Sequence, residues 1–205
     1  MANSMIKHDS GNNATWTKTI VSKTDYRDIM WTDLLEIAED HWKWVQAQPG
    51  AYTRGESCLV AALFLPSTKG GVIFLSTIPR GTKHTEMMNG ARAAPAWFHA
   101  TTGGTNRNTN LQLHAEDGAE FLFETSPYAK GIVSRNLQYV TPDRDNAHSR
   151  MKLAVWGRHK TSPAQGESIA LCTVGEKQPK CPAVARALNI AYCERYKVRF
   201  EQRHT

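Results

Sequence analysis

The sequence predicts an α/β protein in which helices cover a central sheet. Residues 31–45 have helical periodicity, and two apolar runs, 57–66 and 71–79, are separated by a short glycine-containing turn. Further helix-like and strand-like segments alternate after them. Such alternation is typical of a sheet with helices packed on its faces. The 205 residues suffice for one hydrophobic core, so a single domain is expected.

The first predicted helix is amphipathic. Its buried face would be formed by Leu34, Leu35, Ala38, Trp42 and Val45. The two apolar runs that follow predict a β-hairpin. They are almost continuously apolar, which indicates strands that are buried on both faces. A second amphipathic helix begins near residue 114, because Ala115, Ala119, Leu122 and Phe123 have the spacing of one helical stripe.

The remaining segments have weaker patterns. We expect a flexible N-terminal arm over 1–28, a loop over 80–110, weak helical structure over 144–156, a strand over 167–174, a helix over 181–193 and a final strand over 196–202. The helix at 181–193 would carry proline at its first position, as helices prefer. The single domain would therefore span 29–205, with a basic insertion at about 127–167. A parallel crossover is expected to connect the last two strands.

Composition limits the cellular setting. The net charge of +6 and the pI near 9.2 permit a polyanionic partner. We expect no membrane association, because the longest apolar run is far shorter than a membrane span. No secretory signal is expected either, so we predict an intracellular protein, cytoplasmic or nuclear, or one delivered into a target cell. Four cysteines in a chain of this length favour thiol or metal chemistry over a disulfide framework.

An H-x-E motif stands at the entrance of the second amphipathic helix, as His114 and Glu116. Cys172 is expected at the end of a strand, and Cys181 at the start of the next helix. In an α/β sheet these positions share one edge, where ligands bind. One imidazole and two thiolates form a zinc set with a fourth position open to water, as in catalytic sites. Glu116, two residues from His114, would face that water without binding the metal.

These residues resemble the zinc-dependent cytidine deaminase superfamily, whose signature is H-x-E followed by P-C-x-x-C. The likeness covers roughly residues 30–200 and extends to the element order. It implies a three-layer α/β/α fold with a mixed central sheet of about five strands and helices on both faces. It also implies one zinc ion held by His114, Cys172 and Cys181, with Glu116 as catalytic acid and base. Among such proteins, this chain is most similar to the nucleic-acid-editing and toxin-type deaminases.

The cysteine spacing departs from that signature, because eight residues separate Cys172 from Cys181. Either the loop between strand and helix is expanded and Cys172 still reaches zinc, or the first thiolate is replaced by another ligand. Cys193 would lie roughly 18 Å from Cys181 along an intact helix, too far to share one site with it. Cys58 begins a different strand and is expected to be a core residue.

The basic insertion suggests the substrate. Residues 127–167 hold seven Lys and Arg side chains against three carboxylates, with Tyr128, Tyr139 and Trp156 among them. Basic residues interleaved with aromatic ones suit phosphates and an unstacked base. We therefore expect a hydrolytic deaminase converting cytosine to uracil in nucleic acid, preferably DNA. The alternative for this segment is a solvated surface insertion.

Further substrate contacts are expected from Asn108, Asn110, Trp97, Phe98 and Trp156, although asparagines in loops usually form turns. Two other functions stay open. One is deamination of free nucleosides or nucleotides. The other is a non-catalytic nucleic-acid-binding protein with a structural zinc, for which Glu116 would have no use. The sequence decides neither cytosine against adenine, nor DNA against RNA, nor strandedness, nor oligomeric state.

Overall fold

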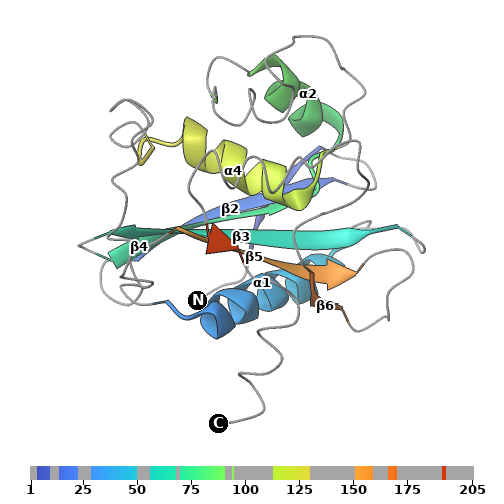
Figure 1. Ribbon diagram of the computed structural model, residues 1–205. Coiled ribbons are helices and arrows are strands. Elements are labelled where there is room, and N and C mark those ends of the chain that lie inside the picture. Colours follow the sequence, from blue (N-terminus) through green and yellow to red (C-terminus); the bar gives the residue numbers. More distant parts are fainter. Residues whose placement is uncertain are drawn as a thin grey trace, which may run out of the picture.

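The computed structural model describes residues 4–9, 14–22, 29–49, 56–67, 70–90, 94, 113–129, 151–158, 166–169 and 191–192. These contain three helices, α1 (Trp31–Gln46), α2 (Gly81–Asn89) and α4 (Ala115–Thr125). They also contain seven strands, namely β1 (Ile6–His8), β2 (Thr15–Ser22), β3 (Cys58–Ser67), β4 (Gly70–Thr77), β5 (Lys152–Arg158), β6 (Glu167–Ser168) and β7 (Ala191–Tyr192). All seven strands belong to one sheet, seen edge-on in Figure 1.

The predicted hairpin, β3 with β4, lies in the middle of this sheet. The strand order is β1-β2-β4-β3-β5-β6, and β7 pairs with β5. Strand β3 is antiparallel to both β4 and β5, whereas β7 is parallel to β5, so the sheet is mixed. The continuous apolar run of β3 follows from this central place, because its side chains are buried on both faces.

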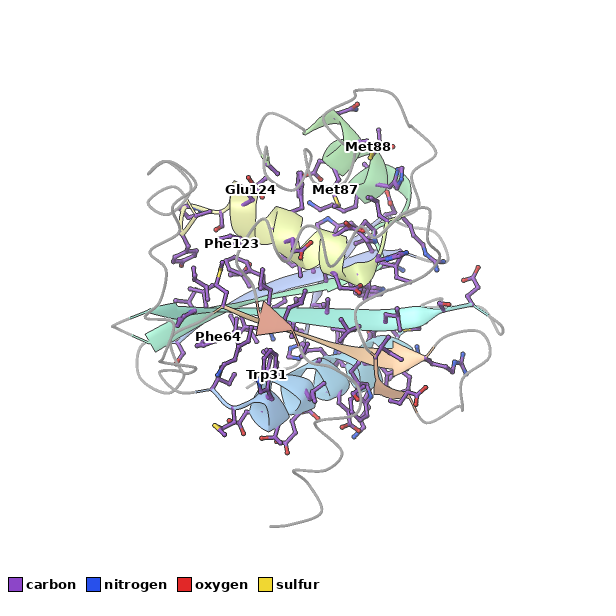
Figure 2. All side chains as sticks on the ribbon, in the orientation of Figure 1. Trp31, Phe64, Met87, Met88, Phe123 and Glu124 are labelled. Atoms are coloured by element: carbon purple, nitrogen blue, oxygen red, sulfur yellow. The ribbon has the colours of Figure 1, made fainter. Side chains whose placement is uncertain are left out.

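Helices cover both faces of the sheet, as expected from the sequence. Figure 1 shows α1 on one face and α4 on the other, with α2 beyond α4. Alternate residues of the central strands divide between two hydrophobic clusters: Leu59, Ala61 and Leu63 pack on the α4 side, and Val60, Ala62 and Phe64 on the α1 side. Figure 2 shows Phe64 on the side of α1 and Phe123 on the side of α4. The sheet is wider than the five strands expected.

The predicted helix at 31–45 is confirmed as α1. Its buried residues include the five predicted apolar ones, together with His41. The helix begins where the Asp33 carboxylate accepts a hydrogen bond of 2.9 Å from the Met30 backbone N–H. At its far end the Trp42 indole donates to the Cys58 carbonyl oxygen over 3.0 Å, which attaches α1 to the start of β3.

The prediction of a flexible arm over residues 1–28 is wrong for the part that the structure describes. Strand β2 pairs with β4 over six residue pairs, and β1 pairs with β2. The polar composition concealed an alternation in which Trp16 and Ile20 point into the α1-side cluster. Thr15 and Thr17 are also buried, because the opposite face of this strand is covered as well.

Three further predictions need correction. Residues 81–89, placed in the loop at 80–110, form α2. Residues 152–156, placed in a weak helix, belong to strand β5, and residues 191–192, placed at the end of the helix at 181–193, pair as strand β7. In each case long-range pairing or packing outweighs a weak local preference. The rest of the predicted elements beyond residue 130 lie outside the described residues, apart from β6, which confirms strand structure at 167–168.

Helix α2 forms despite its polar sequence because its N-terminus is capped by a distant residue. Asp9 Oδ2 accepts a hydrogen bond of 2.9 Å from the Thr82 backbone N–H, and Asp9 Oδ1 accepts one from the Thr82 hydroxyl. Asp9 itself has a φ of 76°, a conformation that asparagine tolerates better than alanine does.

Replacing Asp9 should therefore separate the cap from its backbone strain. Asp9→Ala is expected to lower the free energy of unfolding by about 1–2 kcal/mol, because it removes two acceptors at a position with positive φ. Asp9→Asn keeps an acceptor and suits the conformation, so its loss should be about 0.5 kcal/mol or less. Urea denaturation of both variants measures the difference. An Asp9→Ala variant as stable as wild type would mean that the cap contributes nothing.

A buried histidine joins α1 to β2. His41 Nδ1 donates to the Ile37 carbonyl oxygen over 2.7 Å, so in the neutral ring Nε2 is the acceptor that faces Lys18 Nζ at 3.4 Å. Burial, the largest cause, lowers the pKa of His41 below its usual value of 6.5, and the Lys18 charge lowers it further against the opposing effect of the Ile37 bond. Burial also lowers the pKa of Lys18.

This contact predicts acid sensitivity. Because the folded-state pKa of His41 is lowered, its contribution to stability is present above pH 6.5 and is lost as the pH falls through the folded value. His41→Gln should thus flatten the decline of the unfolding free energy between about pH 7 and pH 5. His84→Gln, on α2, controls for removing a histidine elsewhere. An unchanged pH dependence in His41→Gln would refute the assignment.

Candidate active site at the first turn of α4

Helix α4 begins at the sheet edge where β4 and β5 end. Both strands run antiparallel to β3, so they share a direction and finish at the same edge, beside the first residue of β3. Gly118 fixes the helix there, because a Cβ at this position would overlap Ser76 and come within 3.1 Å of Pro79 Cγ. The carboxyl ends of strands and helix N-termini together form the usual ligand-binding edge of α/β sheets.

The first turn of α4 places His114 and Glu116. His114 is the N-cap residue, with extended backbone, and its N–H donates to Asp117 Oδ2 over 2.7 Å. Leu113 and Ala115 on either side of it are buried in the α4-side cluster, whereas His114 is half-buried. His114 and Asp117 thus form a capping box at the start of α4, in which the Asp117 carboxylate accepts from the His114 backbone N–H.

Glu116 is almost completely buried, with an exposed fraction of 2%. It occupies the first turn of the helix, where the backbone N–H groups favour a negative charge. A buried carboxylate at this position is typical of a chemical role, since Glu is rarely buried in a purely structural setting. The predicted helix and the placement of the H-x-E motif at its N-terminus are thus confirmed.

The same helix carries three more buried carboxyl groups. Glu116, Glu120 and Glu124 recur every four residues, so they follow one flank of α4, and Asp117 lies beside them. Burial, followed by the charges of Asp117, Glu116 and Glu124, raises the pKa of Glu120 well above that of an ordinary carboxyl. Glu120 is not among the residues predicted for the site, although the E-x-x-x-E-x-x-x-E spacing is visible in the sequence.

Helix α2 covers the outer side of α4. Lys83 Nζ lies 3.0 Å from both Glu86 carboxylate oxygens and 5.8 Å from the centre of the Phe121 ring. Met87 packs into the α4-side cluster, and Figure 2 shows it pointing from α2 toward α4. This cover explains why α4 is buried nearly all round rather than along one stripe.

Most of the other predicted site residues lie outside the part of the chain that the structure describes. These are Cys172, Cys181, Asn108, Asn110, Trp97 and Phe98. Within the part of the chain that the structure describes, no three His, Cys, Asp or Glu side chains are grouped so as to hold a metal ion. His114 is accordingly the one predicted zinc ligand whose position is known.

Strand β6 is the described part of the strand predicted over 167–174, at the end of which Cys172 was expected to reach the zinc. Strand β6 is antiparallel to β5, with Ser168 opposite Trp156 and Glu167 opposite Gly157. Over these two residues the chain therefore runs away from the edge where α4 begins, whereas we expected a strand that ends there. The direction of β6 gives no support to Cys172, so its role as a ligand stays a prediction.

Trp156 is not brought together with the H-x-E residues. It packs against the cluster on the α1 side of the sheet, where it and Trp42 both border Gly166. His114 and Glu116 belong to the helix on the opposite face. A direct contact between Trp156 and a base bound beside Glu116 is therefore not supported by this arrangement.

Comparisons with known proteins add no family assignment. No family model, no curated protein and no solved structure matches the chain. Among the described helices, none has the length and apolar character needed to cross a membrane.

Proposed function

We propose that this chain is a zinc-dependent hydrolytic deaminase that converts cytosine to uracil in nucleic acid, with DNA preferred. The observation that carries the proposal is the buried Glu116 in the first turn of α4, two residues after His114, at the edge of a helix-covered mixed sheet where β4 and β5 end. The zinc ligands would be His114, Cys172 and Cys181. The arrangement of α1 and α4 on opposite faces supports a cytidine deaminase-like three-layer fold.

His114 and Glu116, the two described residues of the proposed site, fit a zinc centre. A half-buried imidazole at a helix N-cap can ligate zinc, and a neighbouring carboxylate that is buried in the helix can act on a ligand without binding the metal. Zinc, when bound, lowers the pKa of a water molecule toward neutrality. Asp117, bonded to the His114 backbone, would hold the first turn in place while the imidazole ligates.

Glu116 would then move the protons of the reaction. Its carboxylate takes a proton from the attacking water as oxygen bonds to C4 of the ring, and it passes that proton to ring N3. It then takes the second proton from the hydroxyl group on C4 and passes it to the amine, which leaves as the C4–N bond breaks. Cytosine and water become uracil and ammonia, so no oxidant or second substrate is required. A position in the first turn, shielded from solvent, suits this exchange, because bulk water cannot compete for the proton.

Charge supports a nucleic-acid substrate over a free nucleoside. The net charge is +6, and the insertion at 127–167 holds much of the basic excess. One of its lysines has a structural role instead: Lys152 is buried, donates to the Ile29 carbonyl oxygen over 2.6 Å and lies 5.9 Å from the centre of the Trp31 ring. Phosphate contacts should come from the other basic residues of the insertion.

The deciding experiment incubates the zinc-loaded protein with single-stranded and double-stranded DNA that contains every sequence context. Sequencing then detects C-to-T and A-to-G changes. C-to-T conversion supports the proposal and reports strandedness and context together. Turnover of cytidine alone, with little dependence on salt, would instead identify a nucleoside deaminase. Tight salt-dependent binding without ammonia release would identify a non-catalytic zinc protein.

A further inference from the structure

Glu120 is a fully buried carboxyl group that the proposed mechanism does not use. Its exposed fraction is 0%, and neither Oε1 nor Oε2 accepts a hydrogen bond from an N–H or O–H group of the described residues. Burying a polar group without a partner is unfavourable, and burying a charge is worse. The burial of Glu120 therefore does not stabilise the fold, and it needs another explanation.

The surroundings of Glu120 are acidic or apolar. Asp117, Glu116 and Glu124, all buried, are close enough on α4 to act on it electrostatically. Strands β3 and β4, against which α4 packs, contain no charged side chain. On α2, Lys83 is engaged with Glu86, and on β5, Lys152 bonds to Ile29 on the α1 side. The described neighbours therefore offer Glu120 carboxylates and no cation.

Four carboxylates cannot all remain ionised so close together in a buried setting, and the one without a partner is the natural proton carrier. Glu120 and Glu116 are four residues apart, so their side chains are neighbours on the helix surface. A neutral carboxyl has an O–H that can donate a hydrogen bond, whereas every ionised neighbour can only accept.

We infer that Glu120 is a positioning residue of the proposed active site, held as a neutral carboxylic acid whose single O–H donates a hydrogen bond to the Glu116 carboxylate. The inference rests on the proposed function. In this role Glu120 does not touch the substrate. It fixes the orientation of the Glu116 carboxylate from the interior side, and its raised pKa agrees with that state.

Two substitutions test the role. Glu120→Gln keeps the shape and an N–H donor, so kcat at neutral pH should stay within about threefold of wild type. Glu120→Met keeps the length but removes the donor, so kcat should fall about tenfold or more with KM unchanged, since an interaction that orients a reacting group acts on kcat. Glu36→Gln, an exposed carboxyl group on α1, controls for the loss of a carboxyl group elsewhere and should keep wild-type kcat.

The pH profile adds a readout that a purely structural role would not move. As the pH rises and Glu120 ionises, it ceases to be a donor, so wild-type kcat should decline on the alkaline side. Glu120→Gln cannot ionise and should lack that decline. Glu120→Met should be low throughout.

The protonation state is measured on zinc-free protein, without any assay of activity. Difference infrared spectra at pH 7 should contain the C=O band of a protonated carboxyl in wild type, and this band should be missing in Glu120→Gln. An identical spectrum in both proteins would overturn the inference. So would a Glu120→Met variant with wild-type kcat and pH profile in an otherwise active enzyme.

The two proposals fail differently. A wild-type protein that deaminates no nucleic acid and no nucleoside overturns the proposed function, and the positioning role with it, while the infrared band still reports whether Glu120 is neutral. An active wild type with an equally active Glu120→Met overturns the role of Glu120 alone.

Discussion

Glu116→Gln is expected to lower the rate of deamination about a thousandfold and to leave the fold unchanged. The amide occupies the same volume as the carboxylate in a position that is 2% exposed, so α4 should keep its packing. It cannot take a proton from water, and the barrier rises because both proton transfers lose their carrier. Single-turnover kinetics, with uracil quantified in the product, measures the loss.

The controls for this prediction separate chemistry from stability. Zinc content and the midpoint of thermal unfolding should match wild type, because Glu116 is not expected to bind the metal. Glu36→Gln, an exposed position on α1, should keep full activity. Glu116→Gln with more than a tenth of wild-type activity would exclude Glu116 as the proton carrier.

Replacing His114, a proposed zinc ligand, is expected to have the second large effect. His114→Asn should reduce bound zinc from one ion per chain to about a tenth or less and abolish deamination, since a site that loses one of three protein ligands binds zinc far more weakly. Asparagine is a favourable N-cap residue, and the Asp117 carboxylate can still accept from the backbone N–H of residue 114. Helix α4 should therefore form normally in the variant, so that a loss of zinc reports ligation.

The same measurement of bound zinc shows which cysteines bind the metal. Cys172→Ser and Cys181→Ser should each lose zinc, whereas Cys193→Ser should retain it. Elemental analysis after dialysis against a weak chelator gives the stoichiometry. Because the described residues of β6 run away from the edge at which α4 begins, Cys172→Ser is the most informative of the three. Full zinc content in that variant would assign the position to another residue and would explain the eight-residue spacing.

The elements that could be predicted are those with strong local signals. The β3–β4 hairpin follows from two apolar runs around a turn, and α1 follows from a stripe of five apolar residues that does not depend on its partners. Helix α4 has both a stripe and acidic residues in its first turn, so its start at the H-x-E motif was predictable to within one residue.

The elements that were missed depend on contacts between residues far apart in sequence. Strand β2 is half polar and is stabilised by pairing with β4, some 50 residues away. Helix α2 needs Asp9 at its N-terminus and Met87 in the α4-side cluster. Strand β5 is a short apolar run that could have been helix or strand, and its pairing with β3 decides the matter.

By itself, the sequence determined the chemical identity of the candidate site. An imidazole and a carboxylate two residues apart at a helix start are a local pattern, and such a pattern can be recognised in the sequence without knowledge of the fold. Only the tertiary structure decided that Glu116 is buried at the edge where β4 and β5 end, that Trp156 belongs to the other face, and that Glu120 is fully buried. Burial and electrostatic environment are sums over neighbours from distant segments, so no stretch of sequence contains them.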